Sequence, residues 1–426
     1  MLTNAIRESM DNTETLIVIG AGHAGVELAF AARQQGWAGP IVLLGEEPHL
    51  PYHRPPLSKA FLCGTADAAS LALRQATAFD TAAIALRLGT KVRAIDRAAH
   101  QVLLADGSAL VYTKLALCTG GRARALDVPG MEGPPPPNLF SLRTQADALA
   151  IAGAVREGAR VVIIGAGYVG LEVAASARKL GASVTVLESQ PRVLARVTGA
   201  TLSSFYESVH REAGVDLRTH ASVRAIERDA TGAVSAVLCG DGERLPADVV
   251  IVGIGMLADT ALAEAAGLRV EGGIVVDEHS VTSDPDIVAA GDCTVHDSAL
   301  YGRRVRLESV PNALEQARAA AGWLCAKPRP NHAVPWFWSD QYDLKLQMTG
   351  LADGHDTCVV RGSFVDHSFC AFYLRAGRLI AVDAVNRPAD FMLAKKAVAA
   401  GVQADPQALA DTGLPLKDLL AVVAAA

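Results

Sequence analysis

The sequence lacks the features of a protein that works on nucleic acid, in a membrane or around a metal ion. Its 39 Lys and Arg residues are outnumbered by 45 Asp and Glu residues, a net charge of −6, whereas a nucleic-acid partner requires a basic excess. No apolar run reaches the roughly 20 residues that span a bilayer. The seven cysteines form no C-x-x-C pair and show no metal-ligand spacing. These absences argue against nucleic acid as the main partner and predict neither a membrane span nor a metal site.

The cysteines are odd in number and widely scattered, which is typical of reduced thiols in a cytoplasmic protein. Residues 1–14 are polar and lack the apolar core of a signal peptide. We therefore expect a cytoplasmic protein.

The chain of 426 residues is long enough for two or three domains. Residues 15–47 and 161–189 both read as an apolar strand, a glycine turn, a helix, a second strand and an acid. Between and after these repeats we expect a proline-rich loop leading into a helix at 48–63, short strands at 82–117, a linker at 129–138, a helix at 144–157, a strand at 248–255 and a helix at 311–326. From residue 334 aromatic residues cluster, and alternating strands followed by a helix predict an α+β domain.

Each repeat carries a G-x-G-x-x-G motif, formed by Gly20, Gly22 and Gly25 in the first and by Gly165, Gly167 and Gly170 in the second. In such a motif the first glycine makes the tight turn, the second lets a pyrophosphate approach the backbone, and the third lets the helix pack on the strand. The helix N-terminus then presents free N–H groups to the phosphates. A single motif is weak evidence, but both stand between a strand and a helix, and therefore predict two bound dinucleotides.

An acid follows the second strand of each repeat, Glu46 in the first and Glu188 in the second. Such an acid accepts hydrogen bonds from the ribose hydroxyls and repels a 2′-phosphate, so Glu188 favours NADH over NADPH. Arg192 lies nearby and leaves NADPH as the alternative.

Several segments together resemble the FAD-dependent ferredoxin reductases of bacterial oxygenase systems. They are "LPYHRPPLSK", "LALCTGGRARAL", "GAGYVGLEVAA", "TSDPDIVAAGDC" and "PWFWSDQY", and the resemblance covers nearly the whole chain. It implies an α/β, glutathione-reductase-like fold with two Rossmann-type domains and a C-terminal α+β domain. The implied boundaries are 1–126 with 260–331 for a discontinuous FAD-binding domain, 127–259 for the NAD-binding domain, and 332–426 for the C-terminal domain.

The resemblance also implies the residues that hold each cofactor. Those for tightly bound FAD are Gly20, Gly22, Gly25, Glu46, Arg54, Lys59, Thr119, Gly120 and Asp292. Those for NADH are Gly165, Gly167, Gly170, Glu188, Gly253 and Gly255.

Four further residues are implied to act at the flavin. Lys59 and Glu172 would pair near N5, where the positive charge favours reduced flavin; the alternative is an ion pair with a structural role only. Tyr168 would cover the flavin until nicotinamide displaces it, or is simply a packed aromatic. Trp338 would lie by the dimethylbenzene edge where ferredoxin docks, or is core. The chemistry needs no nucleophile and no metal, because the flavin itself converts a hydride into single electrons.

The implied function is transfer of electrons from NADH through FAD to a 2Fe-2S ferredoxin that supplies a monooxygenase or dioxygenase. Arg318 is the first candidate for docking an acidic ferredoxin, and weaker candidates are Arg303, Arg304, Lys395 and Lys396. We expect the protein to be a monomer. Alternatives are a rubredoxin reductase or NADH oxidase on the same scaffold, or a non-enzymatic flavoprotein resembling the apoptosis-inducing factors. We do not expect disulfide reduction, because Cys63 stands alone where disulfide reductases on this fold carry a pair of redox cysteines.

Overall fold

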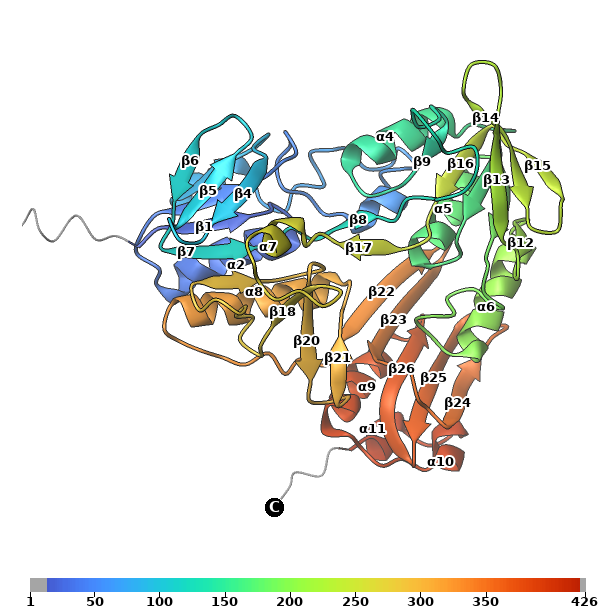
Figure 1. The fold of residues 1–426 in the computed structure, drawn as a ribbon. Helices are drawn as coiled ribbons and strands as arrows, with labels where there is room; N and C mark the ends of the chain where they lie inside the picture. The colour runs from blue at the N-terminus through green and yellow to red at the C-terminus, as the bar shows by residue number, and fades with distance from the viewer. Residues whose placement is uncertain (1–13, 422–426) are drawn as a thin grey trace, which may run out of the picture. The chain divides into compact units, whose positions relative to one another are not determined.

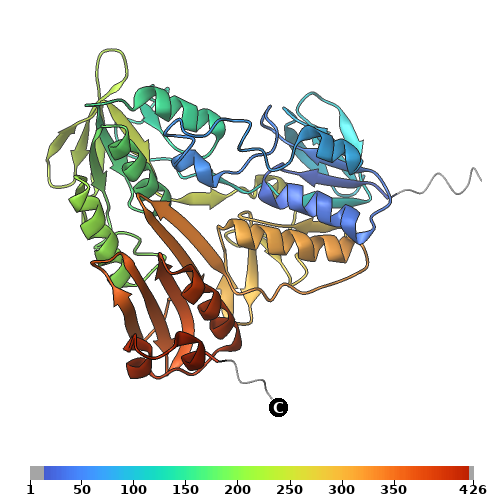
Figure 2. The same ribbon diagram turned by 180° about the vertical axis from the view of Figure 1, so that it is seen from behind.

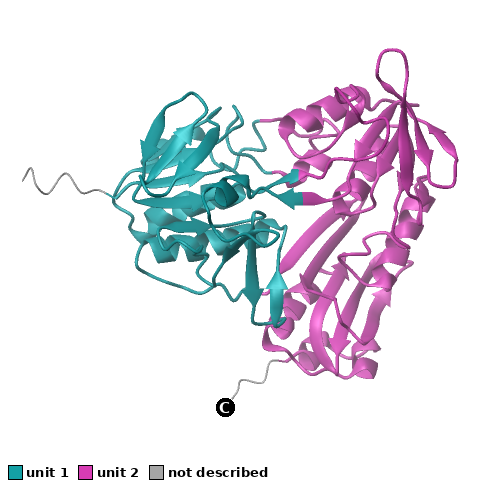
Figure 3. Ribbon diagram, in the orientation of Figure 1, with its two compact units in different colours: residues 1–53, 69–122, 257–333 teal, residues 54–68, 123–256, 334–426 magenta. Residues whose placement is uncertain are grey.

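The computed structural model describes residues 14–421, so most of the polar N-terminal segment lies outside the described part. The chain divides into two compact units (Figure 3). Unit 1 comprises Met1–His53, Ala69–Arg122 and Leu257–Ala333, and unit 2 comprises Arg54–Ala68, Ala123–Met256 and Val334–Ala426. The short strands β8 (Gly121–Ala123) and β17 (Met256–Ala258) contain two of the points where the chain passes between the units. The division into three domains stays a prediction, and residues 54–68 group with unit 2.

Unit 1 is built on a five-stranded parallel sheet with the order β19-β7-β1-β2-β3, of which β1 and β7 are labelled in Figure 1. Its strands are β1 (Leu16–Ile19), β2 (Ile41–Leu44), β3 (Ile84–Arg87), β7 (Lys114–Leu117) and β19 (Ile287–Ala289). All four residues of β1 are buried, because a parallel sheet is covered on both faces. Strand order reverses at β1, so a crevice is expected at the carboxyl ends of β1 and β7.

Helices α2 (His23–Gln35) and α8 (Val310–Leu324) pack against each other, as Figure 2 shows from behind. With Leu16 and Val18 they form one core, while Ile17 and Ile19 on the other face of β1 join a second core. The remaining elements of unit 1 are α3 (Ala76–Thr81), β4 (Val92–Asp96), β5 (Gln101–Leu104), β6 (Ala109–Val111), α7 (Ala261–Ala265), β18 (Ile274–Val276), β20 (Thr294–Ser298) and β21 (Arg303–Val305).

Unit 2 repeats the same architecture, with a parallel sheet in the order β12-β11-β10-β16-β9. Its strands are β9 (Leu139–Phe140), β10 (Arg160–Ile164), β11 (Ser183–Leu187), β12 (Asp216–Arg218) and β16 (Val249–Val252). Around it lie α4 (Gln145–Ala154), α5 (Tyr168–Lys179), α6 (Ala200–Glu212) and the meander of β13 (Val223–Arg228), β14 (Val234–Cys239) and β15 (Arg244–Pro246).

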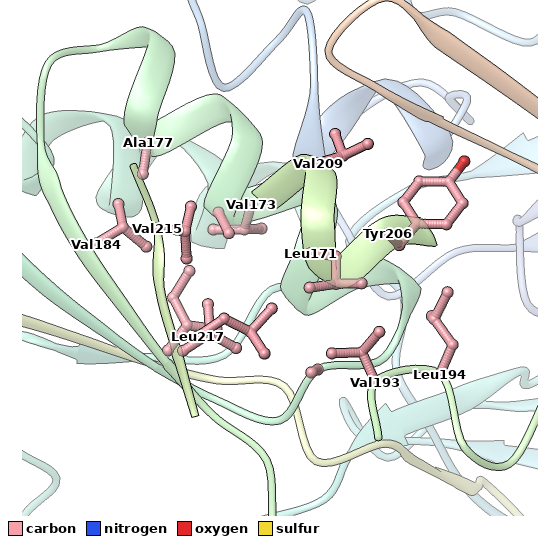
Figure 4. Packing of buried hydrophobic residues seen from close by; sticks show 14 of the residues in the cluster. Leu171, Val173, Ala177, Val184, Val193, Leu194, Tyr206, Val209, Val215 and Leu217 are labelled. Carbon is pink, nitrogen blue, oxygen red and sulfur yellow. The ribbon is translucent and has the colours of Figure 1, made fainter. Parts of the chain in front are cut away.

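The largest core of unit 2 lies around α5 and α6, and Figure 4 shows part of it. Leu171 and Val173 of α5 pack near Val184, Tyr206 and Leu217, and all five are at least nine-tenths buried. Burial of this apolar area, at roughly 25 cal/mol per Å², anchors the start of α5 against the sheet.

The C-terminal part of unit 2 is an antiparallel five-stranded sheet in the order β22-β23-β26-β25-β24. Its elements are β22 (Trp336–Gln341), β23 (Leu344–Gly350), β24 (Thr357–Ser363), β25 (Ser368–Arg375), β26 (Arg378–Val385), α9 (Pro388–Ala400), α10 (Pro406–Ala410) and α11 (Leu416–Leu419). Strands followed by helices match the predicted α+β character of this region.

One local expectation differs from the structure, and a second segment agrees with it. The helix expected within 48–63 is a single 3-10 turn, η1 (Pro55–Ser58), which ends because Lys59 leaves helical dihedral angles, with φ −128° and ψ −110°. Residues 129–138 form no helix or strand, as expected of a linker, but Arg228 donates hydrogen bonds to the carbonyls of Gly130 (2.6 Å) and Pro134 (2.9 Å) and so ties this segment to β13.

Candidate functional site: two dinucleotide cradles and a buried ion pair

The first glycine turn can be built only from glycine at two of its three positions. Gly20 has φ +106°, and a Cβ there would lie 2.1 Å from the carbonyl oxygen of Cys118. A Cβ on Gly25 would lie 1.8 Å from the carbonyl oxygen of Gly20. The turn is therefore pressed against β7 on one side and against its own helix on the other.

The middle glycine, Gly22, is different, because no atom lies within 4 Å of where its Cβ would be. Gly22 is also the N-cap of α2, has no side chain to cap the helix, and is followed by no acidic residue in the first turn. Open space in front of unpaired backbone N–H groups at a helix N-terminus fits a pyrophosphate. The residues present therefore fit the dinucleotide that the motif predicts.

The other predicted FAD ligands of unit 1 lie at the same edge of the sheet. Thr119 and Gly120 follow β7, the neighbour of β1, and Asp292 follows β19, the next strand beyond β7, so both groups stand at carboxyl ends of parallel strands. The Thr119 hydroxyl donates to the carbonyl of Asp259 at 2.6 Å, while Asp292 is half-buried. This edge is where parallel α/β sheets bind their ligands.

Glu46 lies one position later than Glu188 in the aligned repeats. Leu44 pairs with Ile19 as Leu187 pairs with Ile164, so Gly45 occupies the place that Glu188 has in the second repeat. A Cβ on Gly45 would lie 2.9 Å from the Cβ of Ala21, which leaves no room for a side chain there. Glu46 is exposed and forms an ion pair with Lys91 at 2.7 Å.

The second glycine turn repeats the first. Gly165 has φ +104° and its Cβ would lie 2.5 Å from the carbonyl oxygen of Gly253, while a Cβ on Gly170 would lie 2.1 Å from that of Gly165. Gly167, the N-cap of α5, again faces open space. The carbonyl of Gly253, at the end of β16, is thus what the turn packs against, while a Cβ on Gly253 itself would lie no closer than 3.5 Å to Gly170. Gly255 has φ +99° beside the guanidinium of Arg196.

Glu188 stands directly after β11 and closes the turn. Its carboxylate accepts hydrogen bonds from the backbone N–H groups of Ala166 and Gln190, both at 2.8 Å. Arg192 donates to the carbonyls of Thr198 (2.8 Å) and Ala195 (2.9 Å) and to the Ser203 hydroxyl (2.6 Å). The Arg192 guanidinium is therefore committed to shaping its own loop.

Lys59 and Glu172 are brought together within unit 2. The Lys59 ammonium lies 2.8 Å from Oε2 of Glu172, and the side chains are 20% and 6% exposed. Lys59 also donates to the carbonyl of Pro55 at 3.2 Å. A carboxylate buried to this degree needs such a partner, because an unpaired buried charge is costly.

Two serines that sequence reasoning missed complete the surroundings of Glu172. Ser58 donates to its Oε2 at 2.5 Å, and Ser339 donates to its Oε1 at 2.6 Å. Ser58 directly precedes Lys59, and Ser339 directly follows Trp338. Both serines are therefore sequence neighbours of residues that were predicted to act at the flavin. No spacing rule joins positions 172 and 339, and only the packing of β22 on α5 does so.

The aromatic candidates lie at the start of α5 and on β22. The Tyr168 hydroxyl contacts the Met348 sulfur at 2.8 Å, and its ring centroid lies 4.7 Å from that of Phe337. Burial raises the pKa of the Tyr168 phenol well above its usual range, so it stays protonated. Trp338 is half-buried, and its ring centroid is 5.6 Å from that of Trp336.

Two predicted basic residues have partners within their own units. Arg54 donates to the carbonyl of Arg143 at 2.6 Å. Arg318 pairs with Glu27 at 2.7 Å and with Glu315 at 3.1 Å, so its charge is balanced locally although its side chain is half-exposed.

Negative findings apply to the described range. No helix between residues 14 and 421 combines the length and apolar character that crossing a membrane requires. Within that range no three His, Cys, Asp or Glu side chains are grouped so that they could hold a metal ion. All seven cysteines are free.

Two repeated dinucleotide folds, each with an open phosphate-binding turn, together with a separate antiparallel sheet, define the class of two-dinucleotide flavoprotein reductases. The family model for pyridine nucleotide-disulphide oxidoreductases matches residues 14–317, and a reductase C-terminal domain model matches residues 336–420. The chain belongs to the pyridine nucleotide-disulphide oxidoreductase family, whose cofactors are FAD and NADH. This confirms the predicted glutathione-reductase-like fold.

Comparison with individual relatives shows which reductases within this family the chain is similar to. The chain is 49% identical to putidaredoxin reductase CamA of Pseudomonas putida, over 98% of this chain and 99% of the relative. It is 43% identical to rhodocoxin reductase of Rhodococcus erythropolis, over 95% of this chain and 93% of the relative. Among solved structures, the reductase in the covalent putidaredoxin reductase–putidaredoxin complex superposes with a TM-score of 0.92 at 48% identity, covering 96% of this chain and 99% of that one. The resemblance to oxygenase-system ferredoxin reductases is thereby confirmed.

Proposed function

We propose that this protein is an NADH:ferredoxin oxidoreductase that uses FAD and serves a bacterial monooxygenase or dioxygenase. The observation that carries the proposal is the pair of cradles in which Gly22 and Gly167 face open space while the flanking glycines are closed in by backbone. A single dinucleotide site would hold only one cofactor. Two sites allow the same chain to hold both the reductant and the flavin. The similarity to putidaredoxin reductase over nearly full length supports the ferredoxin as acceptor.

The residues assigned to each cofactor follow the two cradles. In this proposal FAD is held by Gly20, Gly22, Gly25, Glu46, Arg54, Lys59, Thr119, Gly120 and Asp292, and NADH is held by Gly165, Gly167, Gly170, Glu188, Gly253 and Gly255. The corresponding domains are 1–126 with 260–331 for FAD, 127–259 for NADH, and 332–426 for the C-terminal domain. The fit of the Gly22 and Gly167 turns to a pyrophosphate supports both assignments.

Bound FAD supplies the step from two electrons to one, since it accepts a hydride and releases electrons singly. The chain's own residues bind, orient and adjust charge around it. Lys59, held by Glu172 at 2.8 Å, is assigned the positive charge beside the flavin ring. Tyr168, at the first position of α5, is assigned the role of covering the ring until nicotinamide enters.

NADH is proposed as the reductant in preference to NADPH. Glu188 stands where a 2′-phosphate would meet a like charge. Arg192, the nearby cation that left the choice open, already donates to two carbonyls and a hydroxyl of its own loop. Its commitment to the loop supports the NADH assignment.

We further propose a cytoplasmic monomer that docks ferredoxin beside Trp338. Seven free cysteines agree with a reducing compartment. Arg318 stays the first docking candidate, but its two carboxylate partners reduce the positive electrostatic potential that it presents to an acidic ferredoxin. Lys395, whose ammonium lies 4.8 Å from the ring centroid of Trp336, is the better placed of the weaker candidates.

The proposal is tested with purified protein under anaerobic conditions. The preparation should carry FAD, be bleached by stoichiometric NADH, and reduce cytochrome c rapidly when a 2Fe-2S ferredoxin is added. A colourless protein that takes up no FAD, or one that stays oxidised in excess NADH, would overturn it. Rapid oxygen consumption without any added acceptor would favour the NADH oxidase alternative, and selective activity with rubredoxin would favour the rubredoxin reductase.

A further inference from the structure

Glu172 is the end point of a chain of hydrogen bonds that extends well beyond Lys59 and is buried except at its outermost member, Tyr342, which is 40% exposed. The residue is 5% exposed, and its Oε1 accepts from the Ser339 hydroxyl at 2.6 Å. The Ser339 oxygen in turn accepts from the Gln341 amide nitrogen at 3.2 Å. The Gln341 oxygen lies 2.8 Å from Nε2 of His210, and Nδ1 of His210 lies 3.1 Å from the Tyr342 hydroxyl.

All donors in this chain point the same way, towards Glu172. An amide oxygen can only accept, so the proton of the His210 ring lies on Nε2, and Nδ1 must accept from Tyr342. Burial lowers the pKa of His210 to about 4, which keeps the ring neutral. Burial also raises the pKa of Tyr342 to about 12, so its hydroxyl remains a donor. Aligned hydrogen bonds polarise one another, and this alignment favours negative charge at the Glu172 end.

The geometry is set by alternation along β22. Phe337, Ser339 and Gln341 lie at every second position and meet Tyr168, Glu172 and His210 respectively. Directly after β22, Tyr342 has φ +56°, a left-handed conformation that is unfavourable for a bulky side chain. Strain of this kind persists where surrounding structure enforces it. Here it places the Tyr342 hydroxyl against His210.

We propose that Ser339, Gln341, His210 and Tyr342 are positioning residues that stabilise the charge of Glu172 and turn its carboxylate towards Lys59. This inference rests on the proposed function, in which Lys59 acts beside the flavin. The four residues touch neither cofactor in this account and act only through Glu172. The C-terminal strand β22 thereby sets the electrostatics of a helix, α5, that lies in the NADH-binding segment.

Other titratable groups surround Glu172 and must be separated from the effect. They are Lys59 directly after η1, Tyr168 on α5, Tyr206 and His210 on α6, Asp340 on β22 and Asp383 on β26. Burial raises the pKa of the Tyr206 phenol, with Glu172 among the contributing charges, so Tyr206 stays neutral. Asp383 is the group that titrates in the useful range, because burial raises its pKa to about 6. An Asp383→Asn background removes that contribution.

The test compares three variants of the FAD-loaded protein. Ser339→Ala removes the donor to Oε1, and Tyr342→Phe removes the outermost hydroxyl. Thr349→Val is the matched control, since the Thr349 hydroxyl is equally buried on the neighbouring strand β23 and has no hydrogen-bond partner. Anaerobic stopped-flow gives the rate of flavin bleaching by NADH from pH 6 to 9, and spectroelectrochemistry gives the midpoint potential of bound FAD over the same range.

In Ser339→Ala the rate of flavin bleaching should fall about tenfold at every pH measured, because a hydrogen bond to the buried Glu172 carboxylate is lost and Lys59 is held less firmly beside the flavin. The midpoint potential of its bound FAD should be more negative than that of the parent protein, since the positive charge of Lys59 then stabilises reduced flavin less well. Tyr342→Phe should show the same change at roughly two- to threefold, in keeping with loss of a more distant neutral hydrogen bond. Thr349→Val should match the parent, and the Ser339→Ala effect should persist in Asp383→Asn.

A Ser339→Ala protein that binds FAD and keeps the parent's rate and potential would overturn the inference. So would a loss of rate with the midpoint potential of bound FAD unchanged, which indicates a merely structural role. If Ser339→Ala does not fold, Tyr342→Phe decides in the same way. Failure of the parent itself to bind FAD or accept electrons from NADH would instead overturn the proposed function, so the two failures are distinguishable.

Discussion

At the scale of single residues, the glycines of a cradle divide into those that shape the turn and one that leaves space for the ligand. Gly170 is closed in by the Gly165 carbonyl, whereas Gly167 faces nothing within 4 Å. Two substitutions by alanine in the same turn should therefore have different consequences.

Gly170→Ala should destabilise the protein by about 1–3 kcal/mol, because the added methyl overpacks the helix against the turn. Gly167→Ala should leave stability nearly unchanged but raise the KM for NADH, because the methyl enters the space assigned to the pyrophosphate. Thermal melts and steady-state kinetics with a small dye as acceptor measure the two effects. Equal effects of both substitutions on melting temperature would contradict the division.

A second prediction at the scale of single residues concerns the pH dependence of stability that arises from Asp383. It is 3% exposed, accepts hydrogen bonds from Thr198 and from the Tyr373 hydroxyl (2.8 Å), and has a pKa raised by burial to about 6. His355 lies nearby with its ring centroid 5.0 Å from that of Tyr373, and its charge lowers the Asp383 pKa slightly.

Because its pKa is higher in the folded than in the unfolded state, the folded protein binds more protons between about pH 4 and pH 6. The contribution of Asp383 to stability is therefore greatest below pH 4 and is lost as pH rises through 6. Melting temperatures of the parent and of Asp383→Asn, measured from pH 4 to 8, should show the parent losing stability relative to the variant across this interval. A constant difference between them would contradict this account.

At the scale of elements, a single arginine holds the C-terminal helices against the sheet. Arg361 on β24 is 4% exposed and donates to the carbonyls of Leu409 (3.1 Å), Asp411 and Leu414 (2.5 Å). These carbonyls lie at the end of α10 and in the turn before α11. Helix ends need such partners for their last carbonyl groups.

Replacing Arg361 with Met should remove these hydrogen bonds and cost roughly 2–3 kcal/mol, since buried carbonyls are left unsatisfied. Amide hydrogen exchange should rise in α10 and α11 while the parallel sheets stay protected. Arg361→Lys, which can reach only part of the set, should show an intermediate effect. Uniformly faster exchange throughout the protein would argue against a local clamp.

The elements also show what could be read from the sequence. Both cradles were predictable because the requirement for glycine is local and its spacing is fixed by one turn of chain. The pairing of Lys59 with Glu172 was predictable by family resemblance alone. Ser339, Gln341 and His210 could not be predicted, because their contacts depend on how β22 packs against α5 and α6. The helix expected within 48–63 was wrong, because the chain leaves helical dihedral angles at Lys59, directly after the 3-10 turn that begins at Pro55.

At the scale of the whole molecule, charge is the feature that bears on the ferredoxin partner. The chain carries a net charge of −6, and an acidic partner would be repelled unless basic residues gather locally. Arg318, paired with Glu27 and Glu315, and Lys395, placed over Trp336, are the residues to compare.

If Arg318 docks ferredoxin, Arg318→Glu should raise the KM for ferredoxin several-fold and leave NADH-driven dye reduction intact, because rim charges act mainly on encounter. The KM for ferredoxin of the parent should also rise with salt, since surface charges are screened beyond about 10 Å at 0.1 M ionic strength. Lys395→Glu serves as the parallel variant. Equal losses in the ferredoxin and dye assays would contradict a docking role for either residue.

The alternation along β22 has a consequence for engineering. One side of this six-residue strand meets α5 and α6, while Trp336 on the other side lies against Phe391 and Lys395 of α9. A chimera that takes the last ninety or so residues from another reductase would carry foreign side chains on both faces of β22, the face that meets α5 and α6 and the face that meets α9. Such an exchange should succeed only when the donor matches at Phe337, Ser339 and Gln341, and a one-residue insertion in the strand should be worse than any point substitution, because it reverses both sides together.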